Sequence, residues 1–412
     1  MKKNKFLFIF LIITFFIACI YLYKARQLNT FPFNTKIGYY IPNSFKSIIY
    51  KILTPSHDQI ISDKHILNVE SITLPNYNFK MKYGGAIENL DEMNILYLSV
   101  DSDIYLFNTK NKKFKNLENN ISGAYNVRDI KVIENQKLFA VLSVDKKNTN
   151  CGTIVLRLYD FDFNNNIFLY NNERKLWESE ENCKFNSKTS GGRIEFKNDT
   201  FYISTGIFQS PINSGIIPEN WSQKNNSSFG KIIKIPLNNK YEKKIYAKGF
   251  RNPQGLFYFN NILIGTDHGP KGGDEINIIK QDENYGWPCK SYGILYSKSS
   301  NDKNLYPKNS EIEGCINSNV NFIEPLYAFS NSIGISQGLT YENDYFYNFT
   351  KNIFVSSLKG KSLYRLLLNT NNDRVIQIEK INLKKRIRDI LITKNGRFIF
   401  LSDKGFINIV ER

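Results

Sequence analysis

A short apolar strand that ends in a small residue recurs six times along this chain, and a second strand often follows it after a turn. No long stretch beyond the first residues has the i, i+3, i+4, i+7 spacing of an amphipathic helix. Recurrent strand pairs at tens of residues per unit predict an all-β protein with a β-propeller fold rather than a sandwich. We expect these strands to be the inner ones, with their small ends near the central channel. They span residues 95–99, 139–143, 201–205, 262–266, 353–357 and 398–402.

The composition agrees with a strand-rich fold and argues against one class of partner. The chain has 31 Phe and 25 Tyr, and ring-bearing side chains suit strands. Its net charge of +17 would attract nucleic acid or an anionic membrane. The lysines are scattered among Asn and Ile, however, and no long basic block occurs. We therefore expect no nucleic-acid partner.

The N-terminus predicts an export segment. Residues 6–23 carry no charge and lie between lysine-rich flanks, and a membrane-spanning helix needs ~17–25 residues. We expect residues 1–23 to be an uncleaved signal anchor or transmembrane helix, with a lipoprotein signal around Cys19 or a secreted form as alternatives. The rest of the chain then lies outside the cytoplasm, on the periplasmic side of the inner membrane. Residues 24–75, with four prolines, are predicted to be a stalk or irregular cover, and residues 76–412 the propeller.

Four cysteines lie beyond this segment, at positions 151, 183, 289 and 315. An even number in an oxidising compartment suggests two disulfides, although four cysteines allow three connectivities. We favour Cys151 with Cys183 and Cys289 with Cys315, because each pair closes a local loop. Four free buried thiols are the alternative. No cysteine or histidine spacing suits a structural zinc site.

Three polar stretches, residues 249–256, 267–275 and 284–288, combine demands that a structural loop seldom has together. Their Gly-Pro and Gly-Gly steps favour tight turns, so that carbonyl oxygens can face a common point. Asp274 and Glu275 add hard oxygen ligands, and Arg251 adds a planar fork for a carboxylate. The combination predicts a site for an anionic cofactor held with a hard cation.

These stretches also carry a family resemblance. RNPQGL (251–256), HGPKGGDE (268–275) and NYGWP (284–288) resemble the signature of the soluble PQQ-dependent glucose and sorbosone (aldose sugar) dehydrogenases. Residues 190–194, 228–232, 332–336, 357–365 and 386–389 extend the likeness, which covers roughly residues 80–412. The resemblance implies a six-bladed β-propeller that oxidises an aldose or a related sugar or alcohol with PQQ and Ca²⁺. It leaves the electron acceptor open.

The resemblance also implies roles for single residues. Arg251 and Asn252 would meet the quinone oxygens, and Arg251 would stabilise negative charge there. The carbonyl oxygens of Gly269 and Pro270 would bind Ca²⁺. The cofactor's carboxylates would bind Lys359, Arg386 and Arg388. The cofactor's edge would be lined by His268, Asp274 and Ser332. Further calcium would bind at Glu275 and Tyr285.

One position departs from the family pattern. The dehydrogenases have a histidine two residues before the Gly-Gly-Arg turn, and it takes the proton from the sugar hydroxyl. Here Thr189 stands at that position. A threonine hydroxyl cannot accept a proton near neutral pH, and a positioned base contributes ~10²–10⁴-fold. His57 or His65 would have to fold over the mouth to replace it.

Two functions of different classes therefore remain. The first is a PQQ- and Ca²⁺-dependent sugar or alcohol dehydrogenase, with catalysis at Arg251 and at the position of Thr189. The second is a non-catalytic propeller that binds PQQ, a glycan or a protein. The retained cations favour the dehydrogenase. Residues 334–338 match the hydrolase motif GxSxG, but no helical pattern follows them and every histidine precedes Ser336, against the order in that fold.

Overall fold

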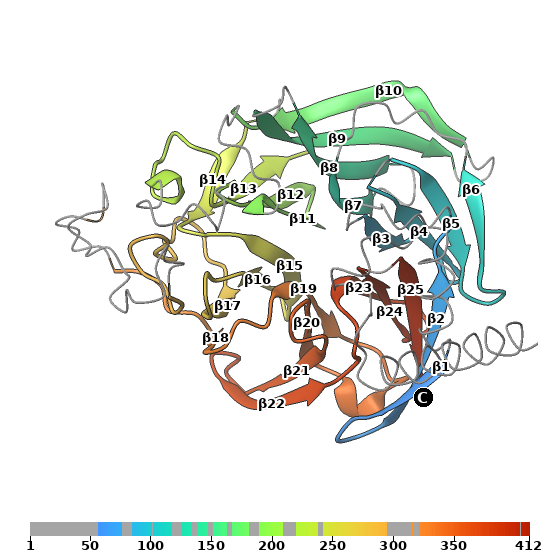
Figure 1. Ribbon diagram of the computed structural model, residues 1–412. Helices are drawn as coiled ribbons and strands as arrows, with labels where there is room; N and C mark the ends of the chain where they lie inside the picture. The colour runs from blue at the N-terminus through green and yellow to red at the C-terminus, as the bar shows by residue number, and fades with distance from the viewer. Residues whose placement is uncertain are drawn as a thin grey trace, which may run out of the picture.

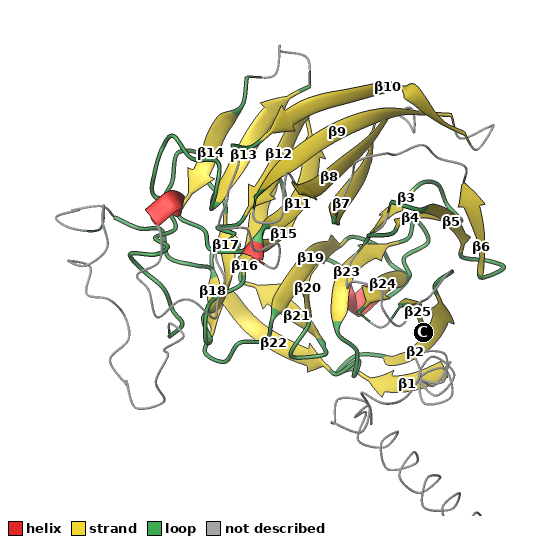
Figure 2. Cartoon of the chain, turned by 45° about the horizontal axis from the view of Figure 1, so that its top comes forward, coloured by secondary structure: helices red, strands yellow, loops and turns green. Residues whose placement is uncertain are grey.

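The fold is a six-bladed β-propeller, as the sequence predicts. The computed structural model describes residues 57–75, 85–100, 102–117, 126–133, 138–146, 151–162, 167–180, 189–208, 220–237, 242–294, 315, 321–403 and 405–412. Their strands form six antiparallel sheets that surround a common centre as blades (Figure 1). The described helical elements are short 3-10 turns, Asn220–Ser222 and Tyr347–Phe349, and the rest consists of strands and loops (Figure 2).

The blades are numbered in chain order, and their strands are given from the centre outward. Blade 1 consists of β3 (Ala86–Asn89), β4 (Asn94–Leu98), β5 (Ile104–Asn108) and β6 (Lys113–Leu117), and blade 2 of β7 (Val127–Ile133), β8 (Leu138–Lys146), β9 (Gly152–Asp162) and β10 (Ile167–Glu178). Blade 3 consists of β11 (Gly191–Lys197), β12 (Thr200–Thr205), β13 (Lys231–Pro236) and β14 (Lys244–Lys248), and blade 4 of β15 (Pro253–Phe259), β16 (Ile262–Asp267), β17 (Asp274–Ile278) and β18 (Tyr327–Phe329). Blade 5 consists of β19 (Ile335–Tyr341), β20 (Asn352–Ser357), β21 (Leu363–Leu368) and β22 (Val375–Ile381), and blade 6 of β23 (Ile387–Ile392), β24 (Phe398–Ser402), β25 (Phe406–Glu411), β2 (Ile66–Thr73) and β1 (His57–Ile61).

The ring is closed by strands from both ends of the described chain. β2 pairs antiparallel with β25, from Asn68 opposite Glu411 to Thr73 opposite Phe406, and β1 adds the outermost strand of blade 6. These two strands fall in the segment that the sequence assigned to a stalk or cover. In the structure the propeller therefore includes strands that lie before residue 76.

The six strands predicted from apolar runs exist, but they are not the innermost ones. They are the second strands of their blades: β4, β8, β12, β16, β20 and β24. The innermost strands β3, β7, β11, β15, β19 and β23 contact one another around the ring. All but β3 have a register shift near their start, where polar or glycine residues interrupt the apolar pattern. A search for apolar runs finds the second strand because it is buried more continuously, as in β20 and β24.

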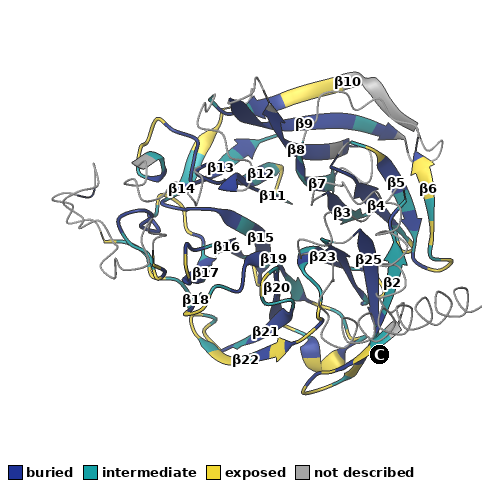
Figure 3. Ribbon diagram, in the orientation of Figure 1, coloured by how far each residue is buried: buried dark blue, intermediate teal, exposed yellow. Residues whose placement is uncertain are grey.

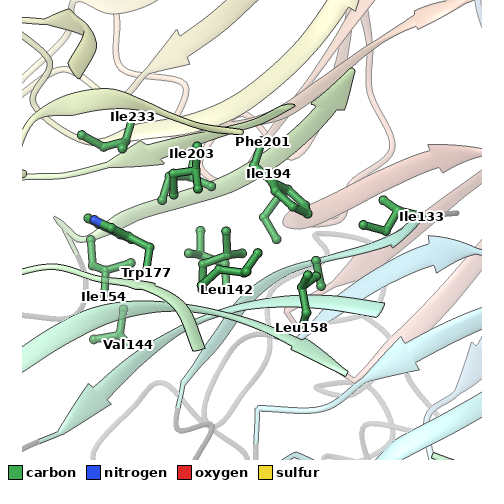
Figure 4. Close-up of a cluster of buried hydrophobic side chains, with 14 of the residues drawn as sticks. Ile133, Leu142, Val144, Ile154, Leu158, Trp177, Ile194, Phe201, Ile203 and Ile233 are labelled. Atoms are coloured by element: carbon green, nitrogen blue, oxygen red, sulfur yellow. The ribbon is translucent and has the colours of Figure 1, made fainter. Parts of the chain in front are cut away.

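The hydrophobic cores lie between blades. Between blades 2 and 3, Leu142, Leu158 and Trp177 pack against Ile194 and Ile203 (Figure 4). The second strands β20 and β24 are buried along their whole length, whereas the outermost strands β6 and β22 carry exposed side chains (Figure 3). Burying apolar area stabilises by roughly 25 cal/mol per Å². The sheets therefore hold the ring as a rigid frame for the loops at its two faces.

The predicted N-terminal anchor, residues 1–23, lies outside the described residues. Within the part of the chain that the structure describes, no helix is long and apolar enough to cross a membrane.

One of the two expected disulfides is described in full. Cys289 and Cys315 are bonded, with Cα atoms 5.4 Å apart. Cys151 is also disulfide-bonded, and Cys183, its expected partner, lies outside the described residues. The Cys289–Cys315 thiols, being bonded to each other, are not available as metal ligands.

We expect the double substitution Cys289→Ser and Cys315→Ser to lower the free energy of unfolding by ~2–4 kcal/mol, because the unfolded chain regains the freedom of the loop between them. Urea denaturation of the double variant and of the oxidised parent measures this difference. Dithiothreitol should lower the parent's midpoint further than the variant's. An unchanged midpoint in the double variant would contradict this assignment.

Candidate functional site

The predicted site residues meet at one face of the propeller. The start of each innermost strand and the end of its antiparallel neighbour share an edge of the blade. Hydrogen bonds join the starts of successive innermost strands: the Gly191 N–H donates to Asn252 Oδ1 (3.0 Å), and the Ser336 hydroxyl donates to the Arg388 carbonyl (2.7 Å). We call this face the mouth. The predicted residues that lie at its strand starts or ends are Thr189, Arg251, Asn252, His268, Gly269, Pro270, Ser332, Lys359, Arg386 and Arg388.

Arg251 is fixed at the mouth by blade 4. The backbone N–H groups of Arg251 and Asn252 donate to the Asp267 carboxylate at 2.8 and 2.6 Å. Burial raises the pKa of Asp267 to about 6, although these two N–H groups oppose the shift. The Arg251 guanidinium is buried and lies 5.5 Å from the centre of the Trp287 ring. Asp267 therefore holds the backbone at Arg251, and the guanidinium lies near an indole ring.

In the loop after β16, two backbone carbonyl oxygens point at the guanidinium of Arg251. Nη1 of Arg251 donates to the carbonyl oxygens of His268 (2.7 Å) and Gly269 (2.9 Å). Gly272 and Gly273 have φ of +85° and +65°, and a Cβ on Gly269 would lie 2.3 Å from the carbonyl oxygens of both. Only glycines permit so tight a turn. Two carbonyl oxygens that converge on a guanidinium nitrogen form an arrangement that also suits a hard cation.

Asp274 holds this loop against blade 5. Its carboxylate is fully buried and accepts hydrogen bonds from the N–H groups of Gly269 (3.1 Å), Ile333 (2.9 Å) and Ile335 (3.1 Å). The Ser332 hydroxyl also donates to it. In the structure Asp274 and Ser332 therefore bind each other and order the loops beside the predicted cofactor edge.

His268 lies at the mouth in a buried setting that lowers its pKa. The nearby Arg251 lowers this pKa further, against the attraction of Asp274. Its Nδ1 lies 2.7 Å from the Gly269 carbonyl oxygen, which only accepts, so Nδ1 carries a proton. Side-chain exposure of 23% leaves the ring within reach of a ligand.

Glu275 lies directly opposite Asp267 in the ladder of β16 and β17, and Tyr285 packs among aromatic side chains. Glu275 follows Asp274 on β17 and therefore points to the opposite face of the sheet; burial raises its pKa to about 8. The Tyr285 ring stacks on Phe250 with centroids 4.6 Å apart, and its hydroxyl donates to the Ile278 carbonyl. The structure gives both residues packing environments between strands, and their calcium role stays a prediction. Among the described residues there is no cluster of three acidic, histidine or cysteine side chains suited to a metal ion.

The predicted carboxylate-binding cations come from blades 5 and 6. Arg386 and Arg388 both donate through Nε to Asp403, a residue just past β24 whose side chain is only 4% exposed; the Arg386 bond is 2.6 Å long. Side chains of both arginines remain partly exposed, at 39% and 27%. Lys359, at the end of β20, is exposed. Because both side chains are partly exposed, their guanidinium groups can also donate hydrogen bonds to a ligand.

Thr189 lies in the turn before β11, next to the Arg251 loop. The Phe208 N–H donates to the Thr189 carbonyl, and the Ile207 N–H donates to the Arg251 carbonyl, each at 3.0 Å. Thr189 is largely buried in this turn. His57, on the outermost strand β1, and His65, whose ring packs against Phe346 and Phe349, lie at the periphery of blade 6. Neither histidine covers the mouth.

A family model described as Glucose / Sorbosone dehydrogenase matches residues 127–410. The chain belongs to the glucose/sorbosone dehydrogenase family. It is 32% identical over 181 residues to the aldose sugar dehydrogenase YliI of Escherichia coli K12, a match that spans 42% of this chain and 46% of that protein. It is 40% identical over 71 residues to quinoprotein glucose dehydrogenase B of Acinetobacter calcoaceticus, 15% of each chain.

The fold of the family is also found among solved structures. The PQQ-bound aldose sugar dehydrogenase of Streptomyces coelicolor superposes with a TM-score of 0.59 at 18% identity, covering 85% of this chain and all of that one (100%). The chain spans less than half the length of the curated relatives that it matches. The comparisons therefore establish the family and the fold.

Two residues that hold the mouth together were not predicted from the sequence. One is Asp403, which follows the small residue at the end of β24 as Asp267 follows Thr266 at the end of β16; this shared pattern could have identified it. The other is Arg193, a buried residue of β11 whose guanidinium binds three other innermost strands. Its contacts are Asp389 Oδ1 (3.0 Å), Asp129 Oδ1 (3.5 Å), the Gln254 carbonyl (2.8 Å) and the Arg388 carbonyl (2.7 Å).

Proposed function

We propose that the protein is a PQQ- and Ca²⁺-dependent dehydrogenase that oxidises an aldose or a related sugar or alcohol at the mouth. The observation that carries this proposal is the set of cations, Arg251, Lys359, Arg386 and Arg388, which three blades bring to one face. Asp403 pairs with Arg386 and Arg388, and the positive charge that remains at this face favours an anionic ligand. Relatives named as an aldose sugar dehydrogenase and a quinoprotein glucose dehydrogenase support it.

The residues present fit an anionic quinone. Lys359, Arg386 and Arg388 would bind the carboxylates of PQQ, and Asp403 would orient both arginines. Arg251 and Asn252 would bind the quinone oxygens. PQQ, when bound, would supply the acceptor for the two electrons that leave the sugar carbon.

The loop after β16 fits a calcium ion next to that quinone. The carbonyl oxygens of Gly269 and Pro270 would bind it, with hard oxygen donors that suit Ca²⁺. Since the Gly269 carbonyl also accepts a hydrogen bond from Arg251, a cation at this carbonyl would compete with the guanidinium. We infer that the ion would release Arg251 toward the cofactor.

A second function, ligand binding without turnover, is favoured by one observation. Thr189 occupies the position of the expected base, and its hydroxyl cannot take a proton near neutral pH. The same mouth would then bind PQQ, a glycan or a protein without oxidising a sugar.

We also infer that the propeller works outside the cytoplasm, on the periplasmic side of an inner membrane and anchored by residues 1–23. The lipoprotein and the secreted form remain the alternatives. The disulfide between Cys289 and Cys315 supports an oxidising compartment. The partners would be the membrane, the sugar and an electron acceptor.

Reconstitution tests the proposal. The purified protein is loaded with PQQ and CaCl₂, and oxidation of aldoses is followed with a dye as the artificial electron acceptor. We expect dye reduction only when sugar, PQQ and Ca²⁺ are all present, and loss of the signal with EDTA. PQQ binding without dye reduction by any sugar or alcohol would favour the second function instead.

We expect Lys359→Ala to weaken PQQ binding about tenfold, or ~1.4 kcal/mol. The lysine is exposed, so water screens its pairing with a carboxylate and the loss stays below that of a buried ion pair. Fluorescence titration with PQQ measures the affinity. Lys380→Ala, which removes an exposed lysine from the outermost strand β22 of the same blade, is the control and should bind like the parent. Equal affinities for all three proteins would remove Lys359 from the cofactor site.

A further inference from the structure

Arg128 is a cation at the mouth that the sequence did not single out as a site residue. It lies in Val-Arg-Asp-Ile (127–130) at the start of β7, and Arg388 lies in Ile-Arg-Asp-Ile (387–390) at the start of β23. In both blades the register shifts at the arginine, which is the extra residue of a β-bulge. The aspartate that follows each arginine binds Nη1 of the same residue, Arg193. The two arginines therefore stand at equivalent heights on the channel wall, where a bulge re-aims the side chain.

The aliphatic part of the Arg128 side chain packs against the turn before β11 in blade 3. A Cβ on Gly192 would lie 2.6 Å from Cβ and 2.7 Å from Cγ of Arg128. Gly192 also has φ of +109°, a conformation that glycine adopts without strain. The arginine thus lies across the turn that begins with Thr189, the position from which a proton acceptor would reach the substrate.

Arg128 lies in a different blade from the proposed cofactor residues, although one of them, Arg388, is its neighbour. Those residues come from blades 4, 5 and 6, whereas Arg128 and Thr189 belong to blades 2 and 3. A sugar must place its reacting carbon against the quinone and its hydroxyl toward the proton acceptor. The sugar therefore extends over blades 2 and 3, and Arg128 lies on its side of the mouth.

The electrostatics at Arg128 favour an anion. Burial, followed by the neighbouring Arg388 and Arg193, lowers its pKa to about 10, so the guanidinium is charged at neutral pH. A negative group between these cations would be stabilised by all of them, in a site with less screening than bulk water. The net charge of +17 adds a long-range attraction for anionic ligands.

We propose that the substrate is an aldose that carries an anionic group, a carboxylate or a phosphate, and that this group binds the Arg128 guanidinium. The planar fork of arginine pairs with two oxygens of either group at once. This inference rests on the proposed function, because the direction of the sugar is set by the cofactor residues. It makes Arg128 a specificity-determining residue.

Calorimetry tests this independently of turnover. Glucose, glucuronate and glucose 6-phosphate are titrated into the protein, both loaded with PQQ and Ca²⁺ and free of PQQ. We expect at least one anionic sugar to bind about tenfold more tightly than glucose, the scale of one charge-assisted pair. Arg128→Leu, which keeps an apolar stem against Gly192, should bring the ratio of affinities close to one, and Arg128→Lys should keep part of it. Arg374→Leu, which removes an exposed arginine before β22, should keep the parent's ratio.

Three results would overturn the inference: no preference for either anionic sugar, the same ratio in Arg128→Leu as in the parent, or weaker PQQ binding in Arg128→Leu, which would make Arg128 a cofactor residue. Thermal melts establish that each variant is folded. If PQQ fails to bind the parent, the proposed function fails, while the sugar ratio of the PQQ-free protein still reports on Arg128.

Discussion

Arg193→Ala is expected to lower the free energy of unfolding by ~3–5 kcal/mol, the cost of removing one partner of a buried ion pair. The substitution leaves the carboxylates of Asp129 and Asp389 buried at the centre of the ring and removes the hydrogen bonds of the guanidinium to blades 2, 4 and 6. Chemical denaturation measures the loss. Arg397→Ala, which removes a partly exposed pair with Glu411, is the control and should cost less than ~1 kcal/mol.

The loss should also depend on pH. Burial raises the pKa of Asp129 to about 7, and Arg193 opposes this shift. Without the arginine the folded-state pKa rises further above its unfolded value of ~4. A carboxyl with a raised folded-state pKa destabilises the protein increasingly as pH rises between these values. The variant should therefore lose more stability at pH 8 than at pH 6, and a loss no larger than that of Arg397→Ala would show that Arg193 does not tie the blades together.

Thr189→His is expected to raise the rate of aldose oxidation by the PQQ-loaded protein by ~10–100-fold. A well-placed base contributes ~10²–10⁴-fold, and an unoptimised side chain recovers only part of it. The turn that carries Thr189 is already hydrogen-bonded next to the Arg251 loop, so a longer imidazole can reach toward the mouth. Initial rates with a dye acceptor, measured across pH, should rise with the titration of the new histidine.

Thr189→Val is the matched control, since it keeps the shape of threonine and removes its hydroxyl. We expect it to leave the slow rate of the parent unchanged. Brisk turnover by the parent, with no gain in Thr189→His, would mean that another group takes the proton. His268→Asn would then test the nearest candidate, the imidazole beside Arg251.

The strand repeat was enough to predict the propeller, because apolar runs reveal strands that are buried on both faces. It assigned those strands to the channel, whereas in the structure they are the second strands and the channel is lined by strands interrupted at bulges. Local patterns cannot reveal that β2 completes blade 6, since its partner β25 lies at the other end of the chain. The closing strand is specified by pairing across the whole sequence.

In the site too, local sequence patterns reveal some residues, and contacts between distant parts of the chain determine the others. The glycine turns and Arg251 form one local loop system, and sequence patterns could indicate it. The contact between Arg193 and Asp389 joins residues that are 196 positions apart, and Asp403 acts on Arg386 and Arg388 only after β23 and β24 pair. These contacts are specified by the folded ring. The sequence gives no local signal for the contact of Arg193 with Asp389, whereas the position of Asp403 directly after the end of β24 is a local signal for that residue.

Isothermal titration of the purified protein with PQQ, in the presence of Ca²⁺ and after its removal with EDTA, tests the central claim most directly. We expect saturable binding of one PQQ per chain with Ca²⁺ and markedly weaker binding without it, because the cofactor's carboxylates need the cations at the mouth and the quinone needs the ion at the carbonyl loop. Absence of PQQ binding in both conditions, or binding that does not respond to Ca²⁺, would contradict the account of this site.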